Sequence, residues 1–210
     1  MSAISISQLW SRAWDLFKVN WLLLVGLLVL AIIVSLIPFI GALIVGILVL
    51  PALVRAGYLV ARQGQSSFGE AFGDISLLLK VFVYYLILAL IPAILIGVGF
   101  ILLGGDSAGT GSILVVVGYL LLFILSLFGW AGPYVILSGR AGIFNAIEQS
   151  FSLTAQNFGK VFVAFLSYIG LAILGAIPCG LGLLVVGPMA YVFWPLLYLA
   201  LTGEESVSHA

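Results

Sequence analysis

Charged residues are scarce in this chain of 210 residues, where Asp, Glu, Lys and Arg together make up 7%. Soluble domains carry about 25%. The seven basic and seven acidic residues also balance, so the chain has no net field that would attract nucleic acid. Hydrophobic residues make up 64%, and the mean hydropathy is +1.38. This composition excludes an ordinary soluble domain and indicates a protein that is surrounded by lipid.

Cysteine and histidine are represented by one residue each, Cys179 and His209. A single cysteine excludes an intrachain disulfide and a cysteine cluster. A single histidine, in the polar tail 202–210, leaves neither a Ser-His-Asp triad nor an ordinary zinc site. Glu70 and Asp74 would suit an acid–base pair, but like charges four residues apart are also ordinary on a hydrated helix. We therefore expect no catalytic residue, no metal and no cofactor.

Long segments without charge fill most of the chain, at 19–54, 81–105, 107–139 and 161–203. A helix needs about 20 apolar residues to cross a hydrocarbon core of about 30 Å. The first and last segments are long enough for two such helices, and Pro-Gly turns at 37–41 and 177–180 mark where each folds back. The sequence thus predicts an all-α, polytopic membrane helix bundle in one transmembrane domain, 1–210, with six spans at 20–37, 41–61, 77–103, 113–137, 158–177 and 181–201.

The basic residues indicate how these spans are oriented. They precede the first span or flank the second and fourth connections: Arg12, Lys18, Arg55, Arg62, Lys80, Arg140 and Lys160. Cytoplasmic loops carry the excess of Lys and Arg in multi-pass proteins, so both termini are predicted to be cytoplasmic. Tyr58, Tyr134 and Tyr198 lie near the same ends of the even spans and fit an aromatic belt at that interface.

Parts of the sequence recur. Asn20 and Asn157 have the same spacing as Pro51 and Pro188, and the tetrapeptide Lys-Val-Phe-Val at 80–83 returns at 160–163. These matches predict three repeated hairpins, with units at 4–65, 66–141 and 142–203.

An amphipathic segment opens each unit. In the first unit, one helical face is apolar along Ile6, Leu9, Trp10, Ala13, Trp14 and Phe17. Shorter segments begin at Phe68 and Ile143. We interpret all three as helices that lie in the cytoplasmic interface. The alternative is that such a segment only extends the spanning helix beyond the bilayer.

The centres of the predicted spans contain no ionisable residue. Proton and ion relays normally need such groups near the membrane midplane, so the pattern argues against ion-coupled transport. Arg55 comes closest, about two helical turns inside Arg62. It either extends to the cytoplasmic head groups or faces a cavity and binds an anion, which makes it the one candidate ligand-binding residue.

Residues 146–162 read Ala-Ile-Glu-Gln-Ser-Phe-Ser-Leu-Thr-Ala-Gln-Asn-Phe-Gly-Lys-Val-Phe, and the stretch 11–20 echoes them. This pattern resembles a group of largely uncharacterised bacterial membrane proteins that includes the YciC-like proteins and the membrane domain attached to some glycerophosphodiester phosphodiesterases. The resemblance implies a location in the bacterial inner membrane. It does not imply hydrolase activity, because the phosphodiesterase chemistry belongs to a separate soluble domain.

The lack of a recognisable catalytic, metal or cofactor site favours an accessory or scaffold module. Such a module would bind membrane lipid and partner proteins, or a second copy of itself. We expect no nucleic-acid partner. A small transporter or channel with a pathway between the three hairpins is the alternative. An intramembrane enzyme that acts on lipid through Ser, Thr and Tyr side chains is a third hypothesis.

Overall fold

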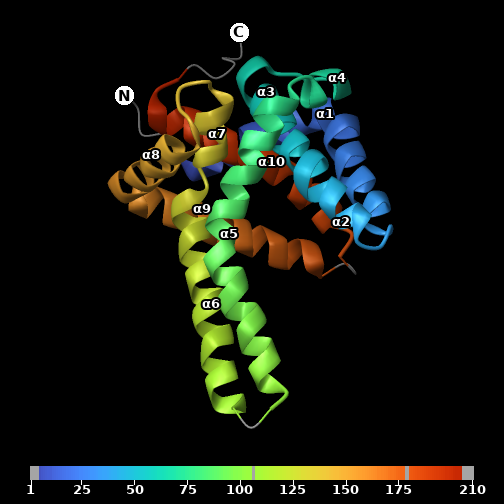
Figure 1. Cartoon of the computed structure of the whole chain (residues 1–210). Helices are drawn as coiled ribbons and strands as arrows, with labels where there is room; N and C mark the ends of the chain where they lie inside the picture. The colour runs from blue at the N-terminus through green and yellow to red at the C-terminus, as the bar shows by residue number, and fades with distance from the viewer. Residues whose placement is uncertain (1–4, 106, 178–179, 205–210) are drawn as a thin grey trace.

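The computed structural model describes residues 5–105, 107–177 and 180–204 (Figure 1). Within these ranges the secondary structure is helical, and no strand is present. Six helical stretches are long and apolar enough to cross a membrane: Ile6–Ser35, Ile40–Gln63, Ile75–Leu103, Ala108–Leu137, Phe158–Ala176 and Leu183–Thr202. The all-α fold class and the six predicted spans are therefore confirmed.

Four of these stretches are single helices, namely α1 (Ile6–Ser35), α5 (Ile75–Leu103), α9 (Phe158–Ala176) and α10 (Leu183–Thr202). The second stretch consists of α2 (Ile40–Ile44), the π-helix η1 (Val45–Val49) and α3 (Leu50–Gln63), and the fourth of α6 (Ala108–Gly129) and α7 (Gly132–Leu137). Two helices lie outside the spans, α4 (Phe68–Phe72) and α8 (Ile143–Gln156). Proline explains both interruptions, because Pro51 and Pro133 have no N–H to donate to the preceding turn.

Helix α1 begins at Ile6, because the amphipathic segment runs directly into the first span. Asn20 separates the two parts with non-helical angles, φ −109° and ψ 15°. Its buried Nδ2 donates to the carbonyl oxygens of Leu16 and Gly64, each at 2.9 Å, and its Oδ1 accepts from the N–H of Ser66 at 3.3 Å. This side chain therefore fixes the kink in α1 against the end of α3.

The core lies where α1, α3, α7 and α10 pack together, at the end of the molecule near both termini (Figure 1). Helices α3 and α10 approach so closely that a Cβ on Gly57 would overlap the carbonyl oxygen of Tyr191. Pro195 leaves this carbonyl without its usual helical donor, since proline has no N–H. Glycine is thus required in α3 where it meets the proline-containing part of α10.

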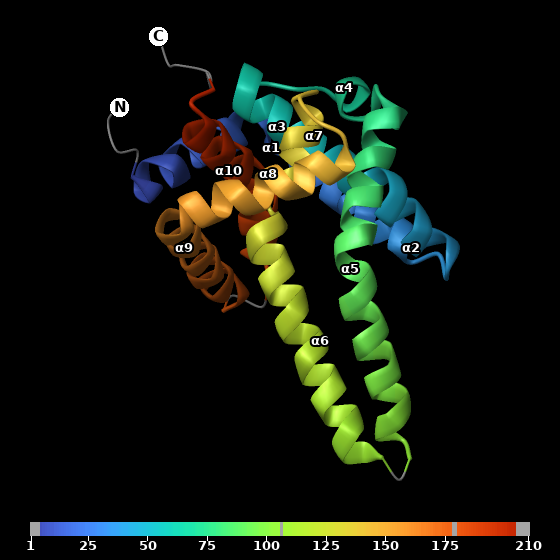
Figure 2. The same cartoon turned by 60° about the vertical axis from the view of Figure 1, so that its left-hand side comes forward.

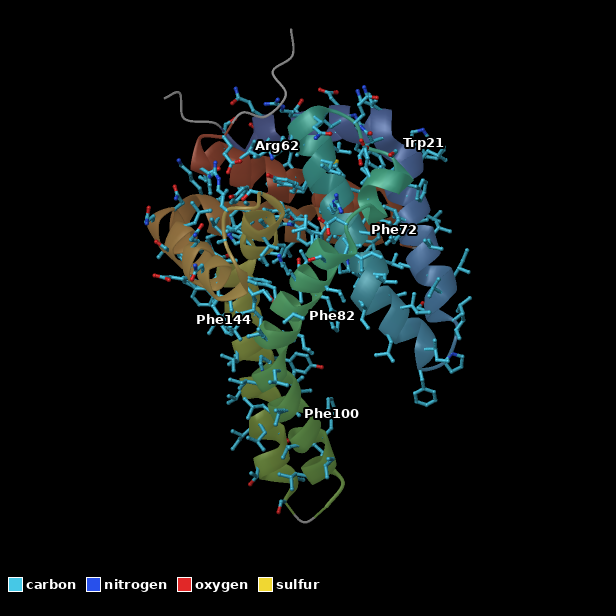
Figure 3. All side chains as sticks on the ribbon, turned by 45° about the horizontal axis from the view of Figure 1, so that its top comes forward. Trp21, Arg62, Phe72, Phe82, Phe100 and Phe144 are labelled. Carbon is cyan, nitrogen blue, oxygen red and sulfur yellow. The ribbon has the colours of Figure 1, made fainter. Side chains whose placement is uncertain are left out.

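Helices α5 and α6 form an arm that projects from the core in both views (Figures 1 and 2). Close contacts hold the arm together: a Cβ on Gly111 would lie 2.7 Å from the carbonyl oxygen of Gly99, and a Cβ on Gly118 would lie 2.6 Å from Cγ1 of Ile96. Side chains such as Phe100, which is 55% exposed, cover the outside of the arm (Figure 3). The outer surface of the arm is therefore suited to contact with lipid.

All three hairpins contribute residues to the core, and the middle one also extends beyond it as the arm (Figure 2). This arrangement does not establish that the three hairpins repeat one unit. The threefold repeat and the orientation of the termini in the membrane remain predictions.

Candidate functional site: an aromatic cavity

A cavity of about 420 Å³ opens between the helices of all three hairpins. Seven aromatic side chains line it, and four smaller or aliphatic residues complete the wall: Tyr85, Trp130, Tyr134, Phe165, Tyr168, Tyr191 and Trp194, with Leu28, Val54, Gly187 and Ala190. Small-molecule sites typically measure about 300–1,000 Å³ and are mostly apolar with a few polar groups. The cavity has the size and the lining of such a site.

Several lining residues lie a short distance inside the basic ends of their helices. With a rise of about 1.5 Å per residue, Tyr85 lies roughly 8 Å along α5 from Lys80, and Val54 lies roughly 12 Å along α3 from Arg62. The cavity is therefore one to two helical turns from the end of the bundle that carries the basic residues, and inside the stretches that are apolar enough to span a membrane.

The interruption between α6 and α7 shapes one wall. Pro133 cannot donate to the carbonyl of Gly129, four residues earlier. The buried hydroxyl of Tyr84 on α5 donates to that carbonyl instead, at 2.6 Å. Gly132 makes room for the tyrosine, because a Cβ there would overlap the Tyr84 ring. Helix α5 thus satisfies a backbone group that the proline leaves without a partner, and the neighbouring Tyr85 is directed to the cavity.

Helix α8 stabilises the same interruption from the other side. The hydroxyl of Ser150 donates to the carbonyl of Phe128 at 2.7 Å and accepts from the N–H of Ala131 at 3.1 Å. The indole Nε1 of Trp130 donates to Oγ1 of Thr154 at 3.0 Å. Buried polar groups need such partners in an apolar environment. These bonds hold the Trp130 ring in the wall of the cavity.

Four of the lining rings contact one another in a row, from Tyr134 through Trp130 and Trp194 to Tyr168. The ring centroid of Trp130 is 5.5 Å from that of Trp194 and 6.3 Å from that of Tyr134, and Trp194 is 6.1 Å from Tyr168. Neighbouring planes meet at 47° to 69°. Rings at such angles enclose a volume instead of stacking flat on one another.

Tyrosine hydroxyls provide the polar groups of the cavity. The phenol groups of Tyr85, Tyr134 and Tyr191 lie within electrostatic range of one another. Within the described part of the chain, none of the three hydroxyls makes a hydrogen bond to protein. Tyr85 is 42% exposed, and the hydroxyl oxygens of Tyr134 and Tyr191 are not fully buried, so these groups are accessible to a bound molecule.

A second, more apolar cavity of about 200 Å³ lies between α5 and α6. It shares Tyr85 and Trp130 with the aromatic cavity and is otherwise lined mainly by aliphatic residues, which include Leu88, Leu122 and Leu125. The Tyr85 and Trp130 side chains therefore form part of the wall of both cavities, one mainly aromatic and the other mainly aliphatic.

Arg55, predicted as a ligand-binding residue, is not among the residues that line either cavity. It follows Val54 on α3 and is partly buried, and its Nη1 is buried without a hydrogen-bond partner. Among the described lining residues of the aromatic cavity, none is charged. Binding of an anion by Arg55 stays a prediction.

The acidic pair predicted as an alternative acid and base has structural contacts. Glu70 forms a capping box with Ser67 at the start of α4, and Asp74 caps α5 by accepting from the N–H of Leu77 at 3.1 Å. Neither lines the aromatic cavity. The residues Cys179 and His209 lie outside the described ranges, and the described residues contain no cluster of three or more potential metal ligands.

The predicted aromatic belt of Tyr58, Tyr134 and Tyr198 is wrong. These side chains are only 2–4% exposed and pack on one another, with ring centroids 6.2 Å apart for Tyr58 and Tyr134 and 5.9 Å for Tyr134 and Tyr198. Their helices meet in the core, so residues at equal depth converge instead of facing the interface. The equal depth of these tyrosines on the three even spans thus indicates that they meet beside the cavity, which Tyr134 also lines.

Six long apolar helices and a largely apolar exterior define this chain as a multi-pass α-helical membrane protein. Comparison with protein-family models, with curated proteins and with solved structures gives no match. The resemblance to the YciC-like group therefore stays a prediction, and the function has to be inferred from the cavity itself.

Proposed function

We propose that this protein is a membrane module that binds an amphipathic, lipid-like molecule in its aromatic cavity. The observation that carries the proposal is the chamber of about 420 Å³ whose aromatic walls come from all three hairpins. Its free tyrosine hydroxyls suit a polar head, and the adjoining aliphatic cavity suits part of a hydrocarbon chain. The module has no catalytic role in this proposal and acts by binding lipid and partner proteins.

The setting of the module follows from the same proposal. The basic ends of the helices face the cytoplasm of a bacterial cell, in its inner membrane, because basic residues are retained on that side. The amphipathic segment of α1, together with α4 and α8, lies along the membrane surface. The exposed arm provides contacts to bulk lipid and to partner proteins or to a second copy of the chain.

Photo-crosslinking tests this proposal. Benzoylphenylalanine replaces Phe165, which lines the cavity, or Phe123, which is 47% exposed on the outside of α6. After irradiation of cells, mass spectrometry of the purified chain should show one dominant adduct at position 165. Position 123 should give a mixture that reflects bulk lipid. The same mixture at both positions, or no adduct at 165, would contradict ligand binding in the cavity.

A transport pathway between the hairpins is the second candidate, because every hairpin contributes to the wall of the cavity. If the protein is a transporter, it must move the molecule that crosslinks at position 165 across the membrane of sealed vesicles into which the protein is inserted. Binding without movement favours the accessory module. Movement that stops when Tyr191 is replaced by tryptophan, which fills the chamber, favours the transporter.

A further inference from the structure

We propose that the aromatic cavity selects a quaternary ammonium head group, as in choline-type amphiphiles. This inference rests on the proposed function and specifies the chemical class of the ligand. The faces of aromatic rings carry partial negative charge and attract cations within about 6 Å, most strongly where water is excluded. Two tryptophans and four tyrosines contribute to this one cavity, namely Trp130, Trp194, Tyr85, Tyr134, Tyr168 and Tyr191.

The groups that line the cavity favour a cation over an anion. Among the described lining residues there is no Arg, Lys or His that would pair with phosphate or carboxylate. The indole N–H of Trp130, a possible donor to an anion, is already bonded to Thr154. The phenolic oxygens of Tyr85, Tyr134 and Tyr191 can turn their lone pairs toward a positive charge, since a hydroxyl rotates to suit its partner.

The same wall favours a quaternary ammonium over a primary one. A primary ammonium has three N–H donors, and each needs an acceptor when it leaves water. The described lining residues include no carboxylate that would neutralise it. A trimethylammonium group has no N–H donor, and its methyl groups can lie directly against the rings of Trp130, Trp194 and Tyr134. Its charge is then stabilised mainly by ring faces, with a smaller contribution from the phenolic oxygens.

The aliphatic cavity favours a ligand that carries an alkyl chain as well as the cationic head. It adjoins the aromatic chamber at Tyr85 and Trp130, and residues such as Leu88 and Leu122 line it between α5 and α6. In the proposed complex, the cationic head lies in the aromatic cavity, and a short hydrocarbon chain passes Tyr85 and Trp130 into the aliphatic one. The expected ligand carries an ammonium head and an alkyl chain on one molecule.

Binding measurements on the full chain test this inference. The protein is placed in lipid nanodiscs of phosphatidylethanolamine and phosphatidylglycerol, which contain no choline, and is titrated with hexyltrimethylammonium by calorimetry. The control ligand has the same chain and a neutral tert-butyl head, which matches the shape but not the charge. We expect the cation to bind at least about tenfold more tightly, as several cation–π contacts to one head group allow.

Two tryptophan variants provide matched controls. Trp194→Leu removes a ring from the wall and should weaken binding of the cation about tenfold or more. Trp21→Leu removes an exposed ring outside the cavity, 53% exposed on α1, and should leave the affinity within about twofold. Tyr191→Phe keeps the ring and removes the hydroxyl, so it should weaken binding less than Trp194→Leu. Thermal unfolding of each variant confirms that the chain is folded.

Equal affinity for the neutral control, or unchanged affinity in folded Trp194→Leu, would overturn the inference. Neither result affects the crosslink at position 165, so the proposed function fails or survives independently. Nanodiscs that contain phosphatidylcholine separate two sources of the head group. If the natural ligand is a choline lipid, this lipid competes and the apparent affinity for hexyltrimethylammonium falls. If it is a free amphiphile, the affinity is unchanged, and both results support the ammonium site.

Discussion

In a soluble protein, the more apolar of two helices is usually the more buried one. For helix α5 of the arm and helix α10 of the core the reverse holds. The most apolar window of α5 has a mean hydropathy of 3.0, and 11% of it is buried. The corresponding window of α10 has a mean hydropathy of 1.8, and 56% of it is buried. Hydrophobicity does not drive helices together in lipid, where packing and hydrogen bonds do so. Helix α10, the less apolar of the two and the one with two prolines, therefore occupies the interior.

The largest effect in this comparison is expected where α3 crosses α10. Gly57→Ala places a Cβ against the carbonyl oxygen of Tyr191, and we expect a loss of about 3 kcal/mol in the free energy of unfolding, because backbone must move. Titration with denaturing detergent, followed by circular dichroism, measures this loss. Gly97→Ala on the arm is the control, since a Cβ there meets no atom within 4 Å. Equal stability of the two variants would contradict the close crossing.

The next effect concerns the interruption between α6 and α7. Tyr84→Phe removes the hydroxyl that donates to Gly129 at 2.6 Å, which leaves a buried carbonyl unpaired and should cost about 1–3 kcal/mol. The same unfolding titration measures it. Tyr119→Phe, at a position 53% exposed on the arm, should change the unfolding free energy by less than about 0.5 kcal/mol. A loss that is no larger at Tyr84 would show that another donor satisfies Gly129.

A smaller and more local effect is expected inside the arm. Gly118→Ala places a Cβ 2.6 Å from Cγ1 of Ile96, and we expect a cost of about 1–2 kcal/mol for the adjustment. Spin labels on the outer ends of α5 and α6 should report a wider separation. Ligand binding in the aromatic cavity should persist, because the contact lies outside its wall. Loss of binding would show that the arm and the cavity are coupled.

The smallest effect is expected on the outside of the arm. Phe100→Leu exchanges one apolar side chain for another at a position 55% exposed, so the unfolding free energy should change by less than about 0.5 kcal/mol. The matched change Phe193→Leu affects a fully buried ring that stacks on Trp10 at 3.8 Å and should cost about 1–3 kcal/mol. Similar losses at both positions would mean that the arm packs against another chain.

The number of spans follows from the sequence because the thickness of the bilayer fixes the length of a charge-free segment. The predicted ends agree closely with the helices for the third span, 77–103 against Ile75–Leu103, and for the fifth, 158–177 against Phe158–Ala176. The sequence does not mark where helix α1 begins, because the helical period continues from the amphipathic segment into the first span. Only the angles at Asn20 reveal the kink.

The aromatic cavity was not predicted, since its wall depends on which faces of separate helices meet. Periodicity within one helix carries no information on that point. The even spans did contain a usable signal. Pro51, Pro133 and Pro195 free backbone carbonyls, which in lipid must be satisfied by other parts of the protein. The helix segments around these three prolines are therefore expected inside the bundle, and the aromatic residues beside them are expected to face one another.

The broken fourth crossing also constrains how the protein is made. Two carbonyls at the end of α6 take their donors from Tyr84, which is synthesised earlier, and from Ser150, which is synthesised later. When this segment leaves the ribosome, only the first donor exists. The crossing is therefore incomplete until α8 emerges and docks, so the middle hairpin cannot mature independently of the chain that follows it. We therefore expect the fourth crossing to reach its final packing only after α8 has been synthesised.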